Sequence, residues 1–155
     1  MNDEITPKQA LTLLISLLVV ALCGIVYELI IGTISSYLLG NSVYQFSITI
    51  GLFMFSMGVG SYITKHFNNQ FIENFVAVEM LIAIVGGLSG IILFTVFPFA
   101  RIFYELTMYA TIFVIGCLVG MEIPILTSLL ALQSGTKQTV ADVLSFDYLG
   151  ALIGS

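Results

Sequence analysis

Apolar residues follow one another in long, almost unbroken runs along this chain. The runs cover residues 10–39, 43–63, 71–97 and 102–132, and a fifth begins near residue 140 and is still apolar at residue 155. Each of the first four is at least as long as the about 20 residues that a helix needs to cross a membrane. The pattern therefore predicts an all-α polytopic membrane bundle with four full transmembrane helices and the start of a fifth.

The polar stretches between the runs are short, so neighbouring helices should pack antiparallel. Two expected helix starts carry a capping-box pattern, Ser42 with Gln45 and Thr139 with Asp142. A third start, with Thr6 as the cap and Pro7 in the first helical position, precedes the first run. The expected connections are residues 40–41, 65–70, 98–101 and 133–138.

Composition supports a membrane protein. Hydrophobic residues make up 59% of the 155 residues and charged residues 8%, whereas soluble domains have roughly a quarter charged residues. A net charge of -5 without a basic cluster argues against binding to nucleic acid. Cys23, Cys117 and the single histidine have no metal-ligand spacing, so we expect no metal site.

The few basic residues predict the orientation. Lys8, Lys65 and Lys137 fall on one side of the membrane and Arg101 on the other. The positive-inside rule then places the N-terminus in the cytoplasm. Four tyrosines are expected at the outer interface: Tyr37, Tyr44, Tyr104 and Tyr109.

Small residues recur at four-residue spacing, which allows helix backbones to approach closely in lipid. This pattern predicts helix packing, within the bundle or in a homo-oligomer. The glycines concerned are Gly86 and Gly90, Gly116 and Gly120, and Gly150 and Gly154.

Three carboxylates lie deep in apolar runs: Glu28, Glu122 and Asp147. Such acids are expensive in a membrane and commonly mark a functional site. The other acids have simpler explanations, because Glu79 should be close enough to the interface to reach water and Glu105 should pair with a basic residue four positions earlier.

Pro124 follows Glu122 by two positions and has no amide hydrogen, so it should bend the helix. Thr127 and Ser128 could bond back to the preceding turn and repair the ladder. The opened helix could line a crevice in which Glu122 and Asp147 share a cation or a proton. The alternative is a protonated or hydrogen-bonded pair that only fixes helix packing.

Three phrases resemble one known family: "YELIIGTISSYLLGNSVYQFSITIGLFMFSMGVGSYI" at 27–63, "VGMEIPIL" at 119–126 and "DVLSFDYLGALIGS" at 142–155. They are similar to the amino-terminal membrane domain of bacterial membrane-bound spermidine synthase-like proteins, the polyamine aminopropyltransferases. In that family the helices precede a cytoplasmic domain that transfers an aminopropyl group from decarboxylated S-adenosylmethionine to putrescine. The resemblance implies a multi-pass protein of the bacterial inner membrane.

The resemblance supplies no catalytic residue and no cofactor for this chain. It implies that residues 1–155 form one membrane domain, truncated at its C-terminus and lacking the soluble catalytic domain, so that transferase activity would belong to the parent protein. Candidate binding residues within the shared phrases are Tyr27 and Glu28, Glu122 and Pro124, and Asp147 and Tyr148.

Three functions remain open. The chain could anchor an aminopropyltransferase and bind or pass a polyamine such as putrescine or spermidine through its intramembrane acids. It could instead be a small cation- or proton-coupled transporter. The third alternative is an inert anchor or assembly subunit.

Overall fold

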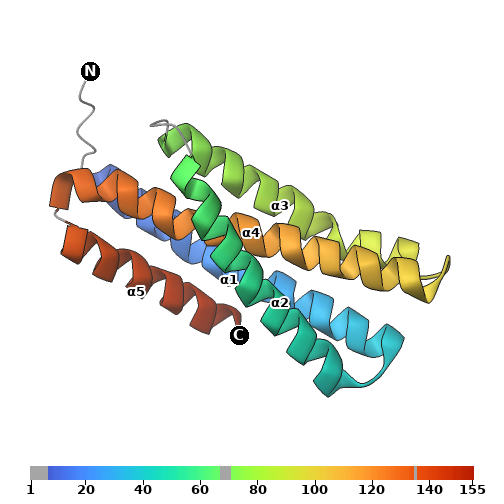
Figure 1. The fold of residues 1–155 in the computed structure, drawn as a ribbon. Helices are drawn as coiled ribbons and strands as arrows, with labels where there is room; N and C mark the ends of the chain where they lie inside the picture. Colours follow the sequence, from blue (N-terminus) through green and yellow to red (C-terminus); the bar gives the residue numbers. More distant parts are fainter. Residues whose placement is uncertain (1–6, 67–70, 135) are drawn as a thin grey trace.

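The computed structural model describes residues 7–66, 71–134 and 136–155, and these residues are almost entirely helical (Figure 1). Four helices, α1 to α4, are long and apolar enough to span a membrane, which confirms the predicted all-α, multi-span fold. The elements are α1 (Pro7–Leu39), α2 (Ser42–Ile63), the 3₁₀ helix η1 (Thr64–His66), α3 (Phe71–Val96), α4 (Arg101–Ser134) and α5 (Thr136–Gly154).

Helix α4 is the centre of the bundle and contacts each of the other four α-helices (Figure 1). In an apolar window of 18 residues within α4, 56% of the residues are buried, compared with 22–28% in the corresponding windows of α1, α2 and α3. The consecutive helices α2 and α3 make no contact with each other within the described ranges, so the expected packing of every helix against the next one is wrong for this pair. Each of them packs on α4 instead.

The outer surface of the bundle is apolar. Large side chains such as Met54 on α2 and Ile91 on α3 are 67% and 64% exposed. Exposed apolar patches of this extent are unfavourable in water and suit a lipid environment, in which helices satisfy their backbone hydrogen bonds internally.

Glycines on α2 and α4 allow the backbones of these two helices to touch. A Cβ atom at Gly60 would collide with the carbonyl oxygen of Cys117, and one at Gly120 would collide with that of Met57. At Gly116 an added Cβ would lie 2.9 Å from the carbonyl oxygen of Phe53. A larger residue at these positions would therefore push the two helices apart.

Two further pairs of glycines lie at contacts of α1. Gly150 and Gly154 on α5 face the backbone of α1, where a Cβ at Gly154 would be 2.7 Å from the Leu22 carbonyl oxygen. Gly86 on α3 accommodates the ring of Tyr27, whereas Gly90 is only in ordinary contact with α1. Each of the six predicted packing glycines thus has a neighbour on another helix.

Two of the expected helix caps are wrong, the one of α2 by a single residue and the one of α5 by at least three. Asn41, with φ 53°, caps α2, and its side-chain oxygen accepts a hydrogen bond from the Tyr44 amide at 3.3 Å. Ser42 instead accepts a hydrogen bond from the Ser36 hydroxyl at 2.6 Å. Because α5 begins at Thr136, Thr139 lies inside the helix and is not its cap.

The expected connection at 133–138 is therefore mostly helical, with residue 135 outside the described residues. The polar composition of this stretch is compatible with a helix end as well as with a loop. The expected cap at Thr6 and most of the 65–70 connection also lie outside the described residues, and η1 covers the beginning of the latter.

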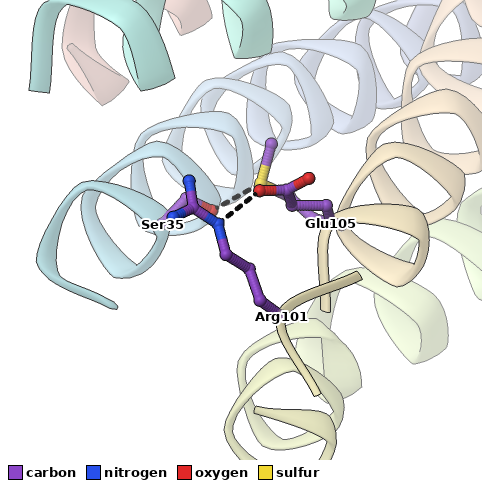
Figure 2. Close-up of polar contacts among 4 residues, drawn as sticks. Ser35, Arg101 and Glu105 are labelled. Carbon is purple, nitrogen blue, oxygen red and sulfur yellow. Dashed lines mark hydrogen bonds and ion pairs between the residues drawn. The ribbon is translucent and has the colours of Figure 1, made fainter. Parts of the chain in front are cut away.

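Polar contacts connect α1 and α4 near the start of α4 (Figure 2). The predicted ion pair is confirmed, with 2.8 Å between Arg101 Nε and Glu105 Oε1. Tyr104, which was expected at the interface, is fully buried between helices, and its hydroxyl shares a 2.9 Å hydrogen bond with the hydroxyl of Ser35. Ser35 also donates to the Met108 sulfur at 2.7 Å, so this buried serine holds α1 against α4.

Candidate functional site

Glu122 is the most deeply buried acid that the structure describes. The residue is 1% exposed, and its Oε1 atom has no hydrogen-bond partner among the described residues. Its position on the central helix α4 explains this burial, since α4 is covered by other helices. A buried ionised carboxylate without a partner is unfavourable by several kcal/mol, and a protonated one still leaves a buried polar atom unsatisfied.

Two other acids lie within electrostatic range of Glu122: Glu79 on α3 and Asp147 on α5. Both helices pack directly on α4, which brings the three carboxyl groups toward one region of the bundle. We call Glu79, Glu122 and Asp147 the acid cluster. The structure thus brings together Glu122 and Asp147, the two residues that the sequence analysis paired.

The sequence analysis missed Glu79 as a member of this cluster. Its Oε1 atom is buried and has no hydrogen-bond partner among the described residues, so the expectation that this carboxyl group reaches water is wrong for that oxygen. Depth along the helix suggested an interfacial acid, but the side chain borders the face of α3 that packs on the bundle, next to the buried Phe75 and Ile82. Its spacing of four from Phe75 and three from Ile82 was the available signal.

No basic side chain within the described part of the chain pairs with the acid cluster. Lys8 and Lys65 are exposed, and the Lys65 ammonium lies 4.5 Å from the centre of the Tyr62 ring. Arg101 pairs with Glu105. In the described ranges no three His, Cys, Asp or Glu side chains are placed closely enough to hold a metal ion. The acid cluster therefore distributes its carboxyl groups over a region wider than one metal site.

Glu28 is buried on α1 and stands apart from the acid cluster. It has no hydrogen bond or ion pair with another described residue, and Glu122 interacts with Glu79 and Asp147 but not with Glu28. The neighbouring Tyr27 is partly buried between α1 and α3, where its ring packs over Gly86.

The Tyr27 ring also lines an open groove of about 640 Å³ between α1 and α3. Most of the lining is apolar and includes the glycines at 86, 87 and 90. Tyr148, the partner of Asp147 in the shared phrase, is 66% exposed on α5 and lies outside the acid cluster.

Pro124 lies inside α4, which continues on both sides of it from Arg101 to Ser134. The proline leaves the carbonyl of Gly120 without its usual helical donor. Thr127 and Ser128 make no hydrogen bonds to the preceding carbonyls, so the predicted repair of the ladder is wrong. Gly120 precedes Glu122 by two residues, so this carbonyl belongs to the same turn of α4 as the acid.

This fold and this site define a multi-span helical membrane domain whose interior acids have no basic partner among the described residues. The chain is 46% identical to the polyamine aminopropyltransferase of Leptospira interrogans over 92% of its own length and 28% of that protein. It is 44% identical to polyamine aminopropyltransferase 2 of Ralstonia nicotianae, over 90% of the chain and 28% of the relative. For polyamine aminopropyltransferase 1 of Streptomyces coelicolor the identity is 39%, over 98% of the chain and 29% of the relative.

The resemblance seen in the three phrases is thereby confirmed, and the chain is a homologue of part of the polyamine aminopropyltransferases. It spans less than a third of the length of these relatives. No protein-family model matches the chain. No solved structure matches it either.

Proposed function

We propose that this chain is the membrane domain of a polyamine aminopropyltransferase and that its acid cluster binds a protonated polyamine within the bundle. The observation that carries the proposal is Glu122, a buried acid with an unpartnered oxygen and two further acids within electrostatic range. The names of the relatives supply the class of cation.

The charges of the site favour an organic polycation. Ionised carboxylates within electrostatic range repel one another, and a bound cation would relieve this repulsion as well as the loss of hydration. A polyamine carries several ammonium groups separated by methylene chains. It can therefore neutralise acids that are too far apart for one metal ion, while its methylenes suit an apolar surrounding.

The same proposal assigns the rest of the parent protein. A cytoplasmic catalytic domain would follow this membrane domain and use decarboxylated S-adenosylmethionine as co-substrate, and residues 1–155 would anchor it in the bacterial inner membrane. An N-terminus in the cytoplasm, as predicted from the lysines, would place the end of α4 and the start of α5 on the side of that domain.

Spermidine binding and flux in proteoliposomes test the proposal. The full-length protein is reconstituted as wild type and as the variants Glu122→Gln, Asp147→Asn and Glu79→Gln. We expect each variant to reduce binding or flux of radiolabelled spermidine, with the largest effect at Glu122 because it is the most buried acid.

Glu73→Gln is the matched control, since it makes the same chemical change on α3 at an exposed position. It should leave spermidine binding unchanged. If all four variants bind spermidine as the wild type does and the proteins remain folded, the domain is an anchor only. Uptake of protons or inorganic cations that depends on Glu122, without any effect of spermidine, would instead favour the transporter.

A further inference from the structure

The contact between α1 and α4 fixes how these two helices are aligned. Near one end, a Cβ atom at Gly24 would lie 3.3 Å from the side chain of Val119. Nearer the other end, the hydroxyls of Ser35 and Tyr104 are 2.9 Å apart. From the first contact to the second, residue numbers rise on α1 and fall on α4, so the two helices are antiparallel. The two contacts lie on one shared face, which we call the α1–α4 seam.

Both Glu28 and Glu122 lie on this seam. Glu28 follows Gly24 by four residues and precedes Ser35 by seven, and both spacings keep a residue on the same face of a helix. Glu122 follows Val119 by three residues, which is again the same face. Each of these acids is buried, and neither has a basic partner among the described residues.

The alignment also gives the distance between the two acids along the bundle. Glu28 lies four residues beyond Gly24 in one direction, and Glu122 lies three residues beyond Val119 in the opposite direction. Measured from the Gly24–Val119 contact, which is nearer to both acids than the Ser35–Tyr104 contact, the two positions are roughly 10 Å apart along the helix axes at a rise of 1.5 Å per residue.

A second polar group lies at the level of Glu28. Helix α2 is aligned with α1 by the contact of Gly32 with Phe46, where an added Cβ would be 2.9 Å from the ring. Moving about one turn along both helices from this contact brings Glu28 level with Thr49. Thr49 is 0% exposed, and its hydroxyl has no hydrogen-bond partner among the described residues. Two unpartnered oxygen-bearing side chains thus occur at this level.

We propose that the α1–α4 seam binds a linear polyamine lengthwise, with one terminal ammonium at the acid cluster and the other at Glu28 and Thr49. An extended chain advances about 1.2 Å per bond, so nine bonds between terminal nitrogens span about 11 Å and five bonds only about 6 Å. The seam therefore fits spermidine or an eight-carbon diamine, whereas putrescine is too short to reach both ends. This proposal rests on the proposed function and adds the length of the ligand and a second binding position.

Gly24 and Val119 lie between the two positions and hold the seam closed in this structure. A bound methylene chain requires the Val119 side chain to rotate out of the seam. A methyl group added at residue 24 should block the connection without altering either acid, and a smaller residue at 119 should open it.

Protection of the acids from dicyclohexylcarbodiimide provides the test, because this apolar reagent modifies carboxylic acids inside membranes. The full-length protein in lipid nanodiscs is treated with the reagent in the presence of diamines of three to ten carbons or of spermidine. Modification of Glu28 and of Glu122 is then measured separately by peptide mass spectrometry. This readout is specific to the two residues and is unaffected by amine binding elsewhere in the protein.

We expect short diamines to protect Glu122 alone, and spermidine and the eight-carbon diamine to protect both acids. Attachment at a second point raises affinity through effective concentration, so the longer amines should protect Glu122 at concentrations at least about tenfold lower. Gly24→Ala should abolish this advantage and the protection of Glu28. Val119→Ala should preserve both, and it serves as a second variant if Gly24→Ala fails to fold.

The outcomes separate the two proposals. If amines of every length protect Glu122 equally and none protects Glu28, the lengthwise site is wrong and the acid cluster still binds amines. If no amine protects Glu122, the proposed function itself fails.

Discussion

Replacing Glu122 by methionine should stabilise the bundle, because an acid retained for binding is not optimal for folding. Methionine has a similar length and a similar helix propensity, so the substitution mainly removes the buried polar group. Leaving a buried polar group unsatisfied costs about 1–3 kcal/mol, and Glu122 has one such oxygen in a residue that is 1% exposed. We therefore expect the free energy of unfolding to rise by about 1–3 kcal/mol.

The assay is reversible unfolding in mixed micelles, followed by helical circular dichroism as the fraction of denaturing detergent increases. Leu126→Met is the matched control, since Leu126 is fully buried on α4 one turn after Glu122 and this exchange usually costs less than about 1.5 kcal/mol. If Glu122→Met destabilises the protein by more than the control does, the acid has a structural partner, and the reasoning that it is retained for a ligand is refuted.

Three further predictions concern packing and orientation. Gly120→Ala should destabilise the bundle by about 1–3 kcal/mol, because the added methyl group meets the α2 backbone. Gly58→Ala has open space around it and should be neutral or slightly stabilising, and unfolding both variants in detergent compares their stabilities. Ser35→Ala should lower the free energy of unfolding by about 1–3 kcal/mol, since it leaves the buried Tyr104 hydroxyl without its partner. A double-mutant cycle with Tyr104→Phe should show strong coupling between the two substitutions. Additive effects would rule out the hydrogen bond as the cause. A cysteine introduced by Lys65→Cys should react with an impermeant maleimide from the cytoplasmic side only, and labelling from outside would invert the proposed orientation.

Much of the fold could be predicted from the sequence because lipid imposes a simple rule. A long apolar run must form a helix, and so the four spans were found with their ends close to those in the structure. The ion pair of Arg101 with Glu105 was also predictable, because it depends only on spacing within one helix.

Features that depend on which face of a helix is covered were predicted less well. The sequence predicts Tyr104 as an interfacial aromatic, because it does not show that Ser35 of α1 lies beside it. The sequence predicts Glu79 as an acid that reaches water, whereas one of its oxygens is buried in the packed bundle. Hydropathy gives depth in the membrane but not the direction of a side chain, and the direction decides whether an acid meets water, lipid or another acid.

Helix ends were the other weak point. Ser42 and Thr139 both begin acceptable capping patterns, yet Asn41 caps α2 through its side-chain oxygen, and α5 starts three residues before Thr139. Capping motifs describe local preferences, and a continuing helix can override them when its next turn packs well.

The central claim, that Glu122 binds a polyamine, is tested most directly by solid-state nuclear magnetic resonance of the full-length protein in lipid with ¹³C-labelled glutamate carboxyl groups. The Glu122 signal is assigned by its loss in the Glu122→Gln variant. The account predicts that spermidine shifts this signal, whereas the signal of Glu105, which is paired with Arg101, stays in place. A Glu122 signal that spermidine does not move, at concentrations that saturate the protein, would contradict it.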